Sequence, residues 1–99
     1  MIDGYLLNMH VFNDVSDSKG QALKPLEEAA EVFGAWQARY NMRFASRDAQ
    51  GAFRDDLIDE CIDAVQAVAN LLAAVDATQG EVDAATRRMD ERNGDRGRL

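Results

Sequence analysis

The chain has 99 residues, of which 46% are hydrophobic and 29% are charged, and its net charge is −7. A chain of this length forms one small domain and on its own buries only about two thirds of its unfolded surface. We therefore predict a single domain over residues 1–99 whose core is completed by a second copy. The acidic balance excludes non-specific binding to nucleic acid, which requires clustered Lys and Arg. The single cysteine, Cys61, excludes an internal disulfide and favours a reducing compartment.

The N-terminal stretch "MIDGYLLNMHVFND" carries acidic residues and has no basic segment before its short apolar run. This pattern is not that of a signal peptide. Acidic or amide residues interrupt the apolar runs well before the roughly 20 residues needed to span a bilayer. We expect a cytoplasmic protein with no membrane contact.

Four helices are predicted in chain order. The first spans about 3–16, where apolar residues form a stripe, and the turn-like "SDSKG" (16–20) ends it. The second spans about 22–45, with Pro25 in its first turn, because proline inside a helix costs about 3 kcal/mol. The residues of the second helix expected to face the core are Leu26, Ala29, Ala30, Phe33, Trp36 and Tyr40.

Residues 46–53 are expected to be a loop, and a third helix is predicted over about 54–77 with a wide apolar face. Thr78 is a suitable cap for a fourth helix over about 79–92, and a basic, polar tail occupies 90–99. Long helices with short connections indicate an all-α antiparallel bundle of about four helices. We expect a homodimer or a homotetramer.

Two pairs of carboxylates lie beside the predicted apolar faces. Glu28 and Glu31 are three residues apart in "EEAAE" (27–31), and Glu60 and Asp63 are three apart in "ECID" (60–63). Residues with this spacing share one face of a helix. If the two helices pack side by side, four carboxylates converge, and their mutual repulsion requires protonation or a counter-ion. Mg²⁺ prefers such oxygen ligands, and Mn²⁺ is also compatible. The alternative is a pair of solvated acidic faces.

These motifs resemble those of the MazG-like family of all-α nucleoside triphosphate pyrophosphohydrolases, whose hallmark is EExxE on one helix and ExxD on the next. The family often has an Asn two turns after the ExxD aspartate, and Asn70 stands there. Members also tend to end in a basic segment, and some phage-borne members share the "RNxxRGR" ending found here at 92–98. The resemblance covers about residues 23–99.

The resemblance implies an enzyme that binds Mg²⁺ through Glu28, Glu31, Glu60 and Asp63. It implies hydrolysis of a nucleoside triphosphate (NTP or dNTP) between the α and β phosphates, which yields a nucleoside monophosphate and pyrophosphate. A house-cleaning role against unwanted nucleotides would follow. Phosphoribosyl-ATP pyrophosphohydrolase activity is an alternative on the same scaffold, and a non-catalytic acidic dimerisation module is an alternative of another class.

Further residues are candidates for parts of such a site, each with a plainer alternative. Glu27 is a candidate base that orients the water, or a solvated residue. Lys24, Arg92 and Arg96 are candidates for phosphate binding, although the two arginines also suit the negative end of a helix. Asn70 is expected to bind a sugar or base, or else to bridge two helices.

Three other residues are expected to be structural. Trp36 could stack on a base, but an aromatic residue at helical spacing is more often part of a core. Cys61 is expected to be a buried thiol. His10 has no Cys, Ser or second His with which to form a zinc or nucleophilic site, and we expect it at an interface or partly exposed.

Overall fold

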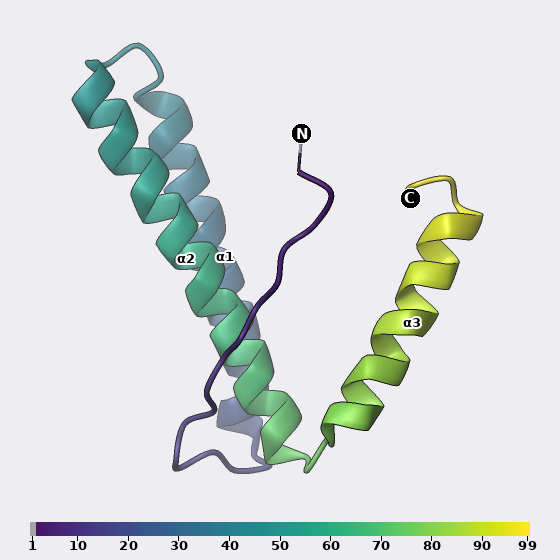
Figure 1. Cartoon of the computed structure of the whole chain (residues 1–99). Helices are drawn as coiled ribbons and strands as arrows, with labels where there is room; N and C mark the ends of the chain where they lie inside the picture. The colour runs from purple at the N-terminus through teal and green to yellow at the C-terminus, as the bar shows by residue number, and fades with distance from the viewer. Residues whose placement is uncertain (1) are drawn as a thin grey trace.

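A computed structural model describes residues 2–99 of the chain, in which the only regular secondary structure is helical and no strand occurs. Three helices occur in this range: α1 (Lys19–Asn41), α2 (Arg47–Ala74) and α3 (Gln79–Asp95). α1 and α2 lie side by side as an antiparallel hairpin, and α3 leaves the far end of α2 in a different direction (Figure 1). The predicted all-α class is confirmed, but the described chain has three helices and not four.

The helix predicted over 3–16 is wrong. Residues 2–12 are extended, and turns and bends connect them to α1. An isolated helix of this length is marginal in water, so it forms only where its apolar stripe packs. Here the backbone instead bonds to α2: the amide of Phe12 donates to Asn70 Oδ1 (3.1 Å), and the carbonyl of His10 accepts from Gln66 Nε2 (2.7 Å).

α1 begins three residues earlier than predicted. The hydroxyl of Ser18 accepts a hydrogen bond from the amide of Gln21 (3.3 Å), so the turn-like segment at 16–20 contains the cap of this helix. Pro25 consequently lies inside α1 and not in its first turn, which corrects its predicted position. Having no N–H, Pro25 cannot donate to the carbonyl of Gln21, and α1 tolerates that loss.

The predicted loop at 46–53 is also wrong, because α2 already begins at Arg47. Ser46 caps the helix by accepting from the amide of Ala49 (3.3 Å). Gly51 lies inside α2, where a glycine costs a helix only about 1 kcal/mol relative to Ala. The true connection between α1 and α2 is the short segment 42–46.

The predicted fourth helix is confirmed as α3, and so is its cap. Thr78 Oγ1 accepts from the amide of Glu81 (3.1 Å), and the Glu81 carboxylate accepts from the amide of Thr78 (3.0 Å), which completes a capping box. α3 extends to Asp95, so six of the ten residues of the predicted tail at 90–99 are helical. Before α3 the chain turns sharply at Asp76, whose φ of 60° is left-handed.

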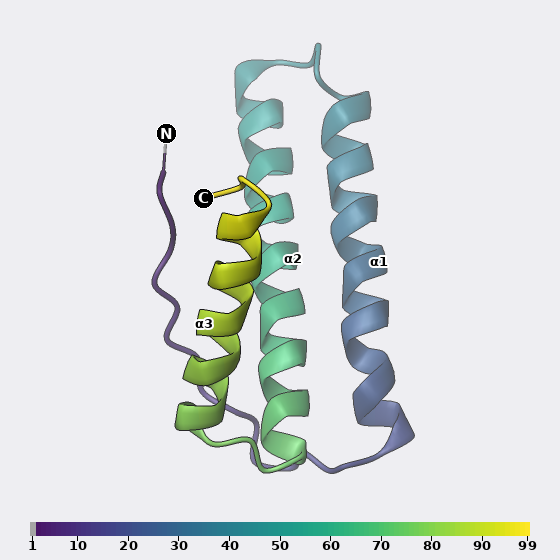
Figure 2. The same ribbon diagram turned by 90° about the vertical axis from the view of Figure 1, so that its right-hand side faces the viewer.

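The described chain is far from compact. Its accessible surface is 8060 Å², whereas a compact monomer of 10.9 kDa would expose about 5,600 Å². Its radius of gyration is 16.4 Å, against about 13 Å for a compact domain of this length. Figures 1 and 2 show the reason: α3 overlaps α2 in one view but is well separated from it in the other. α3 therefore contributes nothing to a core with α1 and α2.

Consequently, the side chains predicted to form the core are largely exposed. Ala67 is the only buried hydrophobic residue among those described, whereas Phe33 is 60% exposed and Trp36 45% exposed. Cys61, expected to be buried, is exposed. The predicted apolar faces exist, but within one chain nothing covers them. No helix in the described part combines the length and apolar character required to cross a membrane.

Candidate functional site

The two helices of the hairpin bring carboxylates from both sequence motifs together. One carboxylate oxygen each from Glu28, Glu60 and Asp63 lies within 4.8 Å of the others. Glu31 is close enough that its charge raises the pKa of both Glu28 and Glu60. The structure thus brings together three of the four carboxylates predicted to converge, while Glu31 acts on them through its charge. We refer to Glu28, Glu31, Glu60 and Asp63 as the acidic cluster.

Two oxygens of this cluster have no partner. Glu28 Oε2 and Glu60 Oε2 are both shielded from solvent, and neither accepts a hydrogen bond. Removal from water raises the pKa of Glu28, and the neighbouring carboxyls of Glu31, Asp63 and Glu60 raise it further. Removal from water likewise raises the pKa of Glu60, with the charges of Glu31 and Asp63 adding to the effect. The cluster therefore carries an electrostatic cost in the absence of a cation.

A divalent cation is the simplest ligand that would offset this cost. Its charge would favour the ionised form of each carboxylate, and the unpartnered oxygens are hard donors of the kind that Mg²⁺ and Mn²⁺ accept. Two or three carboxylates leave coordination positions for water or phosphate oxygens. The residues present therefore fit such an ion.

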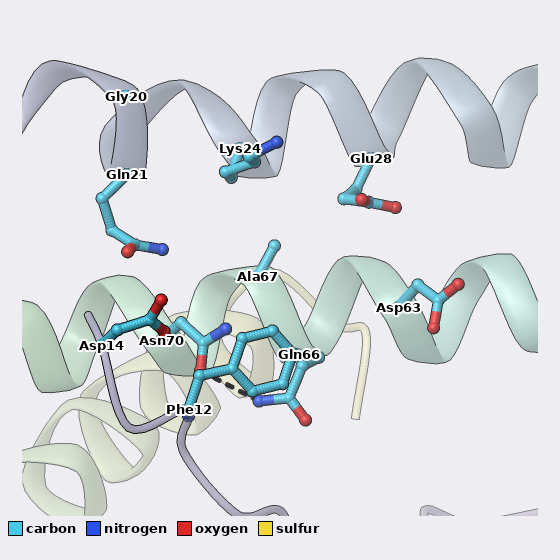
Figure 3. Close-up of a pocket in the computed structure, with 10 residues that line it drawn as sticks. All are labelled: Phe12, Asp14, Gly20, Gln21, Lys24, Glu28, Asp63, Gln66, Ala67 and Asn70. Carbon is cyan, nitrogen blue, oxygen red and sulfur yellow. Dashed lines mark hydrogen bonds between the residues drawn. The ribbon is translucent and has the colours of Figure 1, made fainter.

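A groove adjoins the acidic cluster on the side of the N-terminus of α1. Its volume is about 440 Å³, within the range of small-molecule sites. Glu28 and Asp63 form one end, and Asn70 lies on the α2 side towards the other end (Figure 3). The full lining is Phe12, Asp14, Gly20, Gln21, Lys24, Glu28, Asp63, Gln66, Ala67 and Asn70. A second hollow, which includes Glu31 and Glu60, lies on the other side of the cluster.

Asn70 is the most buried polar residue described, with 4% of its surface exposed. Its Oδ1 accepts from the amide of Phe12 (3.1 Å) and from Gln66 Nε2 (3.0 Å). The side-chain oxygen is therefore engaged in holding the N-terminal segment against α2. The amide nitrogen of Asn70 points towards the groove in Figure 3 and is a donor for a ligand there.

Lys24 and Glu27 form an ion pair (Nζ to Oε2, 3.2 Å), and both side chains are 58% exposed. Lys24 lines the groove one turn before Glu28, where a phosphate-binding residue was expected. Glu27 lies outside both the groove and the group of converging carboxylates. Its geometry matches the solvated alternative, and its role as a base stays a prediction.

Arg92 and Arg96 are not brought to the acidic cluster within this chain. Arg92 lies in the last turn of α3 and Arg96 caps its C-terminus, and α3 packs against neither α1 nor α2. Their predicted part in phosphate binding therefore stays a prediction. Trp36 lies on the exposed apolar face of α1, stacked on Tyr40 at 5.2 Å between ring centroids, and does not line the groove. His10 is exposed, in agreement with one of its expected placements.

Sequence reasoning missed six residues of the groove, of which Gly20 and Ala67 present no polar side chain. Gln21 precedes Lys24 and Glu28 at helical spacing, and Gln66 falls between Asp63 and Asn70, so periodicity alone could have found both. Phe12 and Asp14 belong to the N-terminal segment. The expectation of a helix over 3–16 concealed these two.

Comparisons of the chain with models of known protein families, with curated proteins and with solved structures give no match.

Proposed function

We propose that the protein is a Mg²⁺-dependent nucleoside triphosphate pyrophosphohydrolase of the MazG-like type, with Mn²⁺ as a possible substitute. The observation that carries the proposal is the pair of unpartnered, solvent-shielded oxygens of Glu28 on α1 and Glu60 on α2, which converge with Asp63 of α2. The order of the motifs, EEAAE before ECID, gives independent support from the sequence.

In this proposal the acidic cluster holds the cation and the groove holds the nucleotide. A bound Mg²⁺ would lower the pKa of a coordinated water and neutralise charge on the phosphates. The carboxylates of Glu28 and Glu60 would hold that ion and so would fix where its water lies. The bond that breaks lies between the α and β phosphates, and the products are a nucleoside monophosphate and pyrophosphate.

The lining of the groove suits the remaining parts of a nucleotide. The ammonium group of Lys24 supplies a positive charge beside the cluster for phosphate oxygens, and its pairing with Glu27 limits its movement. The amide nitrogen of Asn70 donates to an oxygen or ring nitrogen of the sugar or base. Phe12 offers an apolar surface on the N-terminal segment. Arg92 and Arg96 would contribute only if α3 of the same or another copy reached the groove.

A homodimer belongs to the same proposal. The chain exposes about 2,500 Å² more than a compact monomer, which exceeds the surface buried in a standard protein interface. Apolar side chains at helical spacing cover the outer faces of α1 and α2, with Phe33 and Trp36 on α1 and Ile58, Ile62 and Val65 on α2. Two hairpins packed through these faces would form a four-helix bundle, and two dimers could form a tetramer.

The experiment that tests the function is product analysis with a panel of NTPs, dNTPs and phosphoribosyl-ATP in the presence of Mg²⁺. We expect monophosphate and pyrophosphate in equal amounts from at least one substrate. Glu60→Gln should reduce the rate by on the order of a hundredfold or more, because it removes a charged oxygen from the cluster. Asp83→Asn, an equal change of charge on the exposed surface of α3, should retain the activity.

The rival proposal is a non-catalytic acidic dimerisation module, which the uncovered apolar faces of the hairpin favour. A dimer that releases no pyrophosphate from any member of the panel, and whose melting temperature does not change with Mg²⁺ and a non-hydrolysable triphosphate, would favour this rival. Turnover of phosphoribosyl-ATP alone would favour the biosynthetic alternative.

A further inference from the structure

The end of the hairpin opposite the groove carries a dense group of positive charges. One pocket of about 320 Å³ is lined by Arg39 of α1, Arg43 of the connection between the helices, and Arg47 and Arg54 of α2. The other lining residues are Tyr40, Gln50 and Gly51, so no carboxylate lines the pocket. We call these four arginines the arginine pocket. Its charge is opposite to that of the whole chain, which is −7.

Within the described part of the chain, none of these arginines forms an ion pair with an acidic side chain. Between residues 2 and 99, the ion pair of Lys24 with Glu27 is the one formed within 4.0 Å, and it lies on another part of α1. Guanidinium groups remain charged at any physiological pH. Four of them around one small pocket therefore repel one another, and an anion in the pocket would relieve that repulsion.

Helix stability explains the positions of only two of the four arginines. Arg39 lies in the last turn of α1 and Arg43 lies two residues beyond its end, where the helix dipole favours a positive charge, and Arg43 Nη1 donates to the carbonyl of Tyr40 (2.9 Å). Arg47 is the first residue of α2, where the dipole disfavours a positive charge. The position of Arg47 therefore requires another explanation, and a ligand of opposite charge provides one.

The pocket is also partly preorganised. The guanidinium of Arg43 lies over the ring of Tyr40 at 4.1 Å and over the ring of Phe44 at 4.8 Å. Tyr40 in turn stacks on Trp36. These contacts restrict the long side chain of Arg43 before any ligand arrives, which lowers the entropic cost of binding.

The arginine pocket is separate from the acidic cluster. Along α1, Arg39 lies eleven residues beyond Glu28, which is about 16 Å at the rise of an α-helix. On α2, Arg54 and Glu60 are six residues apart and project about 120° from each other. A cation held by the acidic cluster is therefore not shared with the arginine pocket.

We propose that the arginine pocket binds a compact, multiply charged phosphate anion: inorganic polyphosphate or the phosphate tail of a nucleotide. The planar guanidinium fork matches phosphate oxygens in pairs, so several arginines around a small pocket favour this class over a monovalent anion. The inference goes beyond the proposed hydrolase activity and does not depend on the acidic cluster.

Isothermal titration of the full chain with inorganic tripolyphosphate in metal-free buffer tests this proposal. We expect saturable binding, and we expect Arg43→Gln/Arg47→Gln to weaken it about tenfold or more, since each lost bond to a charged group is worth roughly 1.5–3 kcal/mol. Arg87→Gln/Arg88→Gln on α3 makes the same change of charge elsewhere and should bind as the wild type does. Glu60→Gln should also retain binding, which separates this site from the acidic cluster.

Two further measurements identify the source of the phosphate and guard against a variant that fails to fold. An NTP that binds more tightly than tripolyphosphate, still dependent on Arg43 and Arg47, would identify the nucleotide as the ligand. If circular dichroism shows that the double variant loses helicity, Arg54→Gln takes its place. Three outcomes would each overturn the proposal. The first is that tripolyphosphate does not bind at millimolar concentration, and the second is that the α3 variant weakens its binding as much as the double variant does. The third is that a single-stranded oligonucleotide binds tightly while tripolyphosphate does not bind.

Discussion

The acidic cluster combines carboxylates from two short motifs that are far apart in the sequence. Glu28 and Glu60 are 32 positions apart in the chain, yet the hairpin holds their carboxylates next to each other and shields one oxygen of each from solvent. The pKa values of both are raised by this shielding and by the neighbouring carboxyls. The same features that make the cluster costly when empty make it a suitable site for a cation.

The raised pKa values predict how stability depends on pH. Because the folded-state pKa of Glu60 exceeds its ordinary value of 4.5, the folded chain holds its proton more tightly than the unfolded chain does. The resulting stabilisation is present below pH 4.5 and is lost as the pH rises through the folded-state pKa. In metal-free buffer, Glu60→Gln should remove this part of the pH dependence and raise the melting temperature at pH 7. Thermal melts of both proteins from pH 4 to 8 measure it.

The control for this prediction is Asp83→Asn on α3, which should leave the pH dependence as it is in the wild type. Parallel pH profiles for the wild type and Glu60→Gln would show that Glu60 is not strained by its surroundings. Added Mg²⁺ should stabilise the wild type at pH 7 more than it stabilises Glu60→Gln.

Asn70 makes a second prediction at the residue scale. Its Oδ1 accepts from the amide of Phe12, so Asn70→Ala leaves that amide without its partner and should release the N-terminal segment. We expect faster cleavage within residues 2–17 in limited proteolysis and a loss of about 1 kcal/mol in stability. Asn70→Asp retains an acceptor and should protect the segment better than Ala does. Equal cleavage of the wild type and Asn70→Ala would contradict the role assigned to this bond.

At the scale of elements, those features of the helices that depend only on neighbouring residues in the sequence were predictable. The cap at Thr78 and the existence of α3 follow from the pattern "TQGE", and the acidic pairs follow from helical spacing. The starts of α1 and α2 were misplaced because Ser18 and Ser46 were assigned to turns and not recognised as caps. The N-terminal segment could not be predicted, because its conformation depends on Asn70 and Gln66, more than 50 residues away.

The cap of α3 gives a prediction at this scale. Thr78→Ala removes the acceptor for the amide of Glu81 and should cost about 1 kcal/mol of helix stability. Because α3 packs on neither of the other helices, the loss should appear as lower helicity by circular dichroism, while the melting transition of the hairpin stays the same. Thr86→Ala is the matched control. Its hydroxyl donates to the carbonyl of Val82 within the helix (2.9 Å), so its removal should keep or increase helicity.

At the scale of the whole molecule, the excess of exposed surface is the dominant feature. The radius of gyration is 16.4 Å, and Ala67 is the one buried hydrophobic side chain among residues 2–99, so a single copy buries little apolar surface. The sequence indicated the apolar faces correctly, but it could not show that these faces find no partner within one chain. That information lies in the spatial arrangement of α3 and the hairpin (Figure 2).

Self-association follows as a prediction. If a second copy covers the apolar faces, the melting temperature should fall on dilution, because association stabilises the folded chain by mass action. Phe33→Asp, on the exposed apolar face, should shift the molecular mass measured by light scattering towards the monomer, whereas Ala85→Asp, on the exposed surface of α3, should not. A wild-type chain that is monomeric at micromolar concentration, with a melting temperature independent of dilution, would contradict this prediction.

The most direct test of the proposed cation site is a titration of the metal-free protein with Mn²⁺. Electron paramagnetic resonance measures the free ion at each step. We predict a saturable site in the wild type that competes with Mg²⁺ and is lost in Glu28→Gln and in Glu60→Gln, but is retained in Asp83→Asn. Binding that is absent, or that weakens equally in all three variants, would show that the four carboxylates share no cation and would contradict the proposed function.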